Sequence, residues 1–181
     1  MISISGHKIH APKGIGALIL RRRNHRRPPL TSIMYGGGQE RGIRPGTLAS
    51  HLIVGLGVAS ENALTNWQVR HAACIRFKEQ LVAALKPLNP HFNGDMSRTV
   101  PNIINMSFDG LDSEAAMLSL KEYVAISNGS ACTSQTYQLS HVLLAMGLSD
   151  KRAESALRWS WCHMSETPDW QAITKEVGSY K

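Results

Sequence analysis

Cysteine is scarce in this chain: its 181 residues include only Cys74, Cys132 and Cys162. An odd number with no Cys-x-x-Cys spacing argues against a disulfide framework and against a common zinc site. Cys74 lies in an apolar, periodic segment, and Cys162 follows a strand-like run. We expect both to be buried, unreactive thiols.

Long apolar runs are also missing. No run approaches the roughly 20 residues of a membrane-spanning helix. The first residues lack the basic start and long apolar stretch of a signal peptide. We therefore expect a cytoplasmic protein without membrane association. Apolar residues still make up 43% of the chain, enough for a hydrophobic core and too many for a disordered chain.

Acidic residues are few, 13 against 20 lysines and arginines, which gives a formal charge of +7. Much of the excess comes from one basic cluster: Arg21, Arg22, Arg23, Arg26 and Arg27. Such a cluster can bind nucleic acid, but no aromatic residue lies between these arginines to stack on bases. We favour a solvated loop and do not expect direct nucleic-acid binding.

Strand-like and helix-like segments alternate along the chain, which indicates an α/β or α+β fold. Strands are predicted at residues 14–20, 103–108, 124–126 and 156–161. Helices are predicted at 47–66, with Thr47 as the cap, and at 67–86, 112–120 and 140–146.

Two N-terminal segments could bind an anion. Residues 3–8 have the sequence SISGHK. Lys8 precedes an apolar stretch, so partial burial could leave its amine neutral enough to form a Schiff base, and Ser5 and His7 could donate hydrogen bonds to a phosphate. Residues 36–47, GGGQERGIRPGT, offer free backbone N–H groups before a helix, but lack the Walker sequence of a triphosphate site. The alternatives are a surface lysine and a tight turn.

Two C-terminal residues are candidates for covalent chemistry and for ligand binding. Cys132 lies among small residues in the segment 127–134, SNGSACTS. Structural cysteines usually lie among larger apolar residues, so we favour a reactive thiol. Arg158 is a lone charge in an apolar and aromatic run and needs a partner. A ligand carboxylate and an internal salt bridge to a glutamate remain equally open.

The segments at 3–8, 36–47 and 127–134, together with PKGIGAL at 12–18 and VPNIIN at 100–105, make five motifs in an order that resembles the cysteine desulfurases. These are pyridoxal-phosphate-dependent enzymes of the aminotransferase class V type. The resemblance implies an α/β fold in which residues 1–66 are part of the large fold type I cofactor-binding domain. Residues 67–181 would form the small α+β C-terminal domain that carries the cysteine loop. The sequence at residues 127–129 is most similar to that of the desulfurases that supply sulfur for DNA phosphorothioation.

The resemblance also implies roles for single residues. Lys8 would form the Schiff base with pyridoxal phosphate, and Ser5 and His7 would hold its phosphate. Thr47 would reach the phosphate of the neighbouring subunit's cofactor. The residues that would act on the substrate are Cys132, which would take sulfur from L-cysteine and leave alanine and a persulfide, and Arg158, which would bind the substrate carboxylate. Cys132 could also be a ligand of an iron–sulfur cluster.

The chain departs from the family in two places: the lysine motif, which lies near mid-chain in relatives, begins here at the N-terminus, and residues 161–163, WCH, replace the family's usual continuation. From this we expect weak pyridoxal phosphate binding and little turnover by the chain alone. The expected partners are L-cysteine, a sulfur-acceptor protein, and a second copy or a companion chain. The alternatives are a selenocysteine lyase and a non-catalytic module that accepts sulfur.

Overall fold

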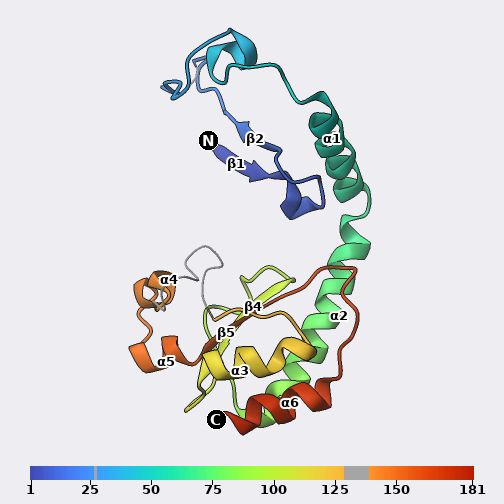
Figure 1. The fold of residues 1–181 in the computed structure, drawn as a ribbon, viewed down its shortest axis with the longest axis vertical. Helices are drawn as coiled ribbons and strands as arrows, with labels where there is room; N and C mark the ends of the chain where they lie inside the picture. Colours follow the sequence, from blue (N-terminus) through green and yellow to red (C-terminus); the bar gives the residue numbers. More distant parts are fainter. Residues whose placement is uncertain (27, 129–138) are drawn as a thin grey trace. The chain divides into compact units, whose positions relative to one another are not determined.

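The computed structural model describes residues 1–26, 28–128 and 139–181, so Arg27 and Cys132 lie outside the described residues. The chain separates into two compact units, Met1–Trp67 (unit 1) and Gln68–Lys181 (unit 2), drawn in Figure 1. None of the helices in these described ranges has the combined length and apolar character needed to cross a membrane.

Unit 1 is built on a two-stranded hairpin followed by a helix. Strand β1 (Ile2–Ser5) pairs antiparallel with β2 (Gly16–Ile19), and the 3-10 helix η1 (Gly6–Ile9) lies between them in the chain. A second 3-10 turn, η2 (Gln39–Gly42), precedes helix α1 (Ser50–Thr65). The strand predicted at 14–20 is confirmed at its centre.

Helix α1 begins three residues later than the sequence predicts. The carbonyl of Ala49 accepts the first helical hydrogen bonds, from the N–H groups of Leu52 and Ile53 at 3.0 and 3.1 Å. Gly46, with φ +103°, turns the chain shortly before this point. Thr47 is therefore an exposed residue ahead of the helix, and its prediction as the helix cap is wrong.

Unit 2 contains a three-stranded antiparallel sheet in the order β3-β4-β5. Its strands are β3 (His91–Phe92), β4 (Ile103–Ser107) and β5 (Ala156–Ser160). Its helices are α2 (Trp67–Leu85), η3 (Lys86–Leu88), α3 (Ser113–Ser119), η4 (Leu120–Glu122), α4 (His141–Ala145), α5 (Asp150–Glu154) and α6 (Trp170–Ser179).

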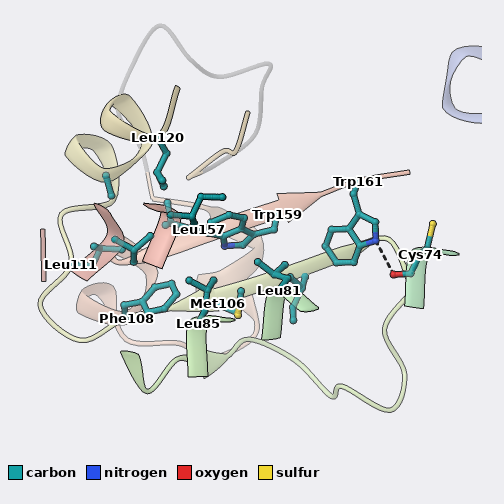
Figure 2. Packing of buried hydrophobic residues seen from close by; sticks show 14 residues of the cluster. Cys74, Leu81, Leu85, Met106, Phe108, Leu111, Leu120, Leu157, Trp159 and Trp161 are labelled. Carbon is teal, nitrogen blue, oxygen red and sulfur yellow. Dashed lines mark hydrogen bonds between the residues drawn. The ribbon is translucent and has the colours of Figure 1, made fainter. Parts of the chain in front are cut away.

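The main core lies between this sheet and the helices α2, α3 and α6. Side chains alternate along β4 and β5, as expected for strands with one buried face, and the buried residues of α2 and α6 pack against them. The fully buried members include Leu81, Leu85, Ile104, Met106, Phe108, Leu157, Ile173 and Val177. Figure 2 shows this cluster and the bond from Trp161 Nε1 to the carbonyl oxygen of Cys74, 3.0 Å long.

Two further predictions in unit 2 need correction. Residues 124–126 form no strand, and Ser127 instead makes an isolated antiparallel bridge to Arg158. Cys162 is half-buried rather than in the core, whereas Cys74 is buried as predicted. Burial raises the pKa of the Cys74 thiol, and the charge of Cys162 adds to this effect.

Removing a core side chain should strongly destabilise unit 2. Leu81→Ala, at a fully buried position of α2, is expected to lower the free energy of unfolding by about 2–5 kcal/mol. Leu118→Ala, on the exposed face of α3, should change it by less than about 0.5 kcal/mol. Urea unfolding followed by tryptophan fluorescence measures both, and equal effects would contradict the core described here.

Candidate active-site residues

The turn between β1 and β2 positions the predicted cofactor-binding residues. Gly6 begins η1, and its N–H donates to the carbonyl of Ile15 at 2.9 Å. A Cβ at Gly6 would lie 2.9 Å from that same oxygen and 3.1 Å from the Cβ of Ala11, so a larger residue would force the turn apart. This close approach explains the glycine of the SISGHK motif.

Ser5, His7 and Lys8 flank this glycine and are all exposed. The Ser5 hydroxyl does not cap η1. The predicted partial burial of Lys8 is wrong, because η1 turns Gly6 rather than the lysine toward Ile15 and Ala11. Together the three side chains present a hydroxyl, an imidazole and an amine at a single turn. This donor set fits a phosphate beside an aldehyde.

The glycine-rich segment closes on itself through side-chain hydrogen bonds. Gln39 Oε1 accepts from the N–H of Gly46 at 3.1 Å, and Ser32 Oγ donates to the carbonyl of Ile43 at 2.9 Å. Glu40 and Arg41 have positive φ values of 49° and 60°, which are costly for residues other than glycine. The segment therefore has a defined conformation, and Thr47 lies exposed at its end.

Arg158 lies on β5, opposite Asn105 of β4, and is half-buried. Its neighbours Leu157 and Trp159 are buried, whereas Arg158 faces the other side of the sheet. In the described parts of the chain, the ion pairs are His91–Asp109 and Arg98–Asp95, and neither involves Arg158. The internal salt bridge left open by the sequence is therefore absent there, so the guanidinium N–H groups are available to donate to the carboxylate of a ligand.

The backbone of Arg158 is also bonded to the start of the predicted cysteine segment. Its N–H donates to the carbonyl of Ser127 at 2.6 Å, and its carbonyl accepts from the N–H of Ser127 at 3.2 Å. Ser127, the first residue of SNGSACTS, is thus held against the strand that carries Arg158. Cys132 itself lies outside the described residues.

Sequence reasoning missed a polar cluster around Arg152. Arg152 of α5 donates from Nε to Asn93 Oδ1 at 2.8 Å and from a terminal nitrogen to the carbonyl of Phe92 at 2.9 Å. Ser107 Oγ donates to the carbonyl of Arg152 at 2.6 Å. These bonds tie α5 to β3 and β4. No pattern in the sequence signals them, because the partners lie 45 to 60 positions apart.

The site residues therefore fall into two sets. Ser5, His7, Lys8 and Thr47 belong to unit 1, and Arg158 belongs to unit 2. The first set offers an amine and donors for an anion. Arg158 offers a half-buried guanidinium without a carboxylate partner in the described residues.

Comparison with known proteins identifies the family to which the chain belongs. The sequence profile of Aminotransferase class-V matches residues 1–173. The chain is 45% identical over 161 residues to the cysteine desulfurase IscS of Shewanella sp. (strain ANA-3). That match covers 88% of this chain and 39% of the relative, so the chain spans well under half the length of the curated protein.

Solved structures agree with this match. The crystal structure of DndA from Streptomyces lividans has a TM-score of 0.73 at 40% identity, covering 92% of this chain and 46% of that one. SspA in complex with cysteine has a TM-score of 0.64 at 35% identity, covering 87% and 42%. The chain belongs to the aminotransferase class-V family. The predicted fold, part of a fold type I α/β enzyme, is confirmed.

Proposed function

We propose that the chain is part of a cysteine desulfurase that uses pyridoxal phosphate to remove sulfur from L-cysteine. The observation that carries this proposal is the η1 turn, which presents Lys8 beside Ser5 and His7 in a chain 45% identical to a cysteine desulfurase. In this proposal residues 1–66 belong to the cofactor-binding domain and residues 67–181 form the small domain.

In this proposal the residues bind and orient the cofactor and the substrate. Ser5 and His7 would hold the phosphate of pyridoxal phosphate, and Lys8 would bind its aldehyde carbon through the amine. When bound, pyridoxal phosphate supplies an electron sink for the substrate's α-carbon. Arg158 would orient the substrate by pairing with its carboxylate in a bidentate manner.

The sulfur transfer balances without an external oxidant. The Cβ–S bond of L-cysteine breaks, and a bond forms between that sulfur and Sγ of Cys132. The products are L-alanine and a Cys132 persulfide. The proton lost from the Cys132 thiol is balanced by a proton gained at the β-carbon, which becomes the methyl group of alanine, so the β-carbon is reduced while the two sulfurs are each oxidised. A thiolate is the reactive form of Cys132, so the attacking sulfur must first lose its proton.

The proposal also includes partners. The persulfide would pass to a protein acceptor in iron–sulfur cluster assembly or in DNA phosphorothioation, and Cys132 could ligate a cluster as cargo. A cytoplasmic location fits the free thiols of Cys74 and Cys162, since reducing compartments keep thiols free.

A second polypeptide would cover unit 1, and Thr47 would then reach the cofactor phosphate of the neighbouring subunit. In support, α1 buries Ala59 but leaves Val54, Val58 and Leu64 between 52% and 77% exposed. The second polypeptide is either another copy or a companion chain. Sedimentation equilibrium of the purified chain checks the homodimer, and a monomer at all concentrations would rule it out.

Alanine formation tests the proposed reaction. Saturating pyridoxal phosphate offsets the weak cofactor binding expected of the chain alone, so the purified chain should release a small, cofactor-dependent amount of L-alanine from L-cysteine and less from L-selenocysteine. A preference for selenocysteine would indicate the lyase instead. Persulfide formation only after addition of an intact desulfurase would indicate a sulfur-acceptor module.

Arg158 should govern the affinity for cysteine. Arg158→Gln is expected to raise the cysteine concentration for half-maximal alanine formation by about tenfold or more, because a charged, bidentate bond is lost. Lys151→Gln, which removes an exposed charge from α5, serves as the control and should leave this concentration unchanged. A lower maximal rate at unaltered half-saturation would contradict a carboxylate-binding role for Arg158.

A further inference from the structure

Helix α2 borders a cavity that the proposed active site does not use. Leu81 and Leu85 of this helix point into the main core (Figure 2), while a neighbouring stripe of α2 lines a cavity of about 400 Å³ together with residues of the segment 96–101. Sites for small molecules typically measure roughly 300–1,000 Å³. This cavity, whose lining residues all belong to unit 2, is therefore large enough for a small ligand. We call it the α2 cavity.

Much of the wall of the α2 cavity is apolar. Ile75 and Val82 come from one face of α2, and Met96 and Pro101 come from the segment that precedes β4. Val82 and Met96 also pack against the main core, which fixes their positions. Ile75, in contrast, remains 37% exposed. The apolar part of a ligand would cover Ile75 and so remove apolar surface from water.

A cationic group lies among these apolar walls. Lys78, three positions after Ile75 on α2, lines the cavity and is half-buried. Its Nζ donates to Oγ1 of Thr99 at 2.6 Å, and this hydroxyl donates in turn to the carbonyl oxygen of Met96 at 3.2 Å. These two bonds anchor the amine at the cavity wall. An ammonium group has three N–H donors, and Thr99 accepts from one of them.

Lys78 has no carboxylate partner in the part of the chain that the structure describes. The ion pairs found there are His91–Asp109 and Arg98–Asp95. Leaving a half-buried charge unpaired costs free energy. A ligand carboxylate would remove this cost and would form a charge-assisted hydrogen bond with the ammonium group. Lys78 therefore favours a ligand with an anionic end.

Glu79 limits the negative charge that such a ligand can carry. It is the residue after Lys78 on α2, lines the same cavity and is exposed. Its carboxylate would repel a second carboxylate on the ligand, but it would attract an amine. The two opposite charges together therefore favour a ligand with one carboxylate, with or without an amine.

We propose that the α2 cavity binds a small molecule that carries a single carboxylate on an apolar body. The carboxylate would pair with Lys78, and the apolar body would cover Ile75, Val82 and Met96. A free carboxylic acid and an apolar α-amino acid share this chemistry. The inference does not depend on the desulfurase proposal, because none of the residues that line the cavity belongs to the proposed active site.

Titration with 4-methylpentanoate and with L-leucine, followed by saturation-transfer-difference NMR, tests the site. The two probes differ only in the ammonium group, and pyridoxal phosphate is left out so that leucine has no aldehyde to react with. At least one probe should bind, and the uncharged 4-methylpentanamide should bind at least about tenfold more weakly. Tighter binding of leucine that is lost in Glu79→Gln would identify an amino acid as the ligand, and equal or tighter binding of 4-methylpentanoate would identify a free acid.

Lys78→Met should weaken binding of the better probe at least about tenfold, because the charge-assisted hydrogen bond is lost. Lys78→Arg, which keeps the cation, should retain most of the affinity. The matched control, Lys121→Met, removes an exposed lysine of η4 and should change the affinity by less than about twofold. Urea unfolding verifies that each variant is folded.

Arg158→Gln distinguishes the α2 cavity from the proposed substrate site, and it should also leave the affinity within about twofold. Four results would overturn the proposal: no binding of either probe, unchanged binding in Lys78→Met, equal weakening in Lys78→Met and Lys121→Met, or loss of binding in Arg158→Gln.

Discussion

Lys8→Ala is expected to abolish specific attachment of pyridoxal phosphate to the chain. The reason is that Ser5 and His7 would hold the phosphate beside the Lys8 amine, and such positioning favours reaction at that amine over others. Borohydride reduction fixes the attached group, and peptide mass spectrometry then locates it. In the unaltered chain, Lys8 should be labelled at least about tenfold more than any other lysine.

Lys13 provides the matched control for this experiment. It is exposed and lies only a few residues further along the same hairpin. Lys13→Ala should leave the labelling of Lys8 unchanged, and Lys8→Ala should not redirect the label to Lys13. Similar labelling of both lysines in the unaltered chain would mean that neither is a cofactor lysine. Because the readout is covalent, it does not require that the chain turn over cysteine.

Cys132→Ser is expected to remove persulfide formation from L-cysteine almost completely, by about a hundredfold or more. A serine hydroxyl occupies nearly the same volume but cannot accept sulfur. Cys162→Ser, at a half-buried position, is the control and should retain the persulfide. Mass spectrometry after alkylation distinguishes a persulfide from a thiol. Retained persulfide in Cys132→Ser would place the reactive thiol elsewhere.

Local signals in the sequence predicted most of unit 2. The predicted helix at 112–120 is confirmed as α3 followed by η4, and its cap is Asp112, whose carboxylate accepts from the N–H groups of Glu114 and Ala115 at 3.1 and 3.0 Å. The strand predicted at 103–108 is confirmed as β4, in which the alternate residues Ile104 and Met106 are buried. The sequence predicts a strand at residues 124–126 where the structure has none, because a short apolar run carries no information about pairing partners.

The candidate site was only partly accessible to sequence reasoning. Arg158 could be found because a lone charge in an apolar strand requires a partner. The exposure of Lys8 could not be predicted from the sequence, because this exposure depends on how Gly6 packs against Ile15 and Ala11. The bonds of Arg152 join residues far apart in the chain, so only the folded structure shows them.

The most direct test of the account follows labelled sulfur. The purified chain is incubated with L-cysteine carrying heavy sulfur, with and without pyridoxal phosphate, and each cysteine peptide is then examined by mass spectrometry. The account predicts a heavy-sulfur persulfide on Cys132, formed only when pyridoxal phosphate is present and absent from the Lys8→Ala variant. Label on Cys132 that is independent of both pyridoxal phosphate and Lys8, or no label on Cys132 under any condition, would contradict it.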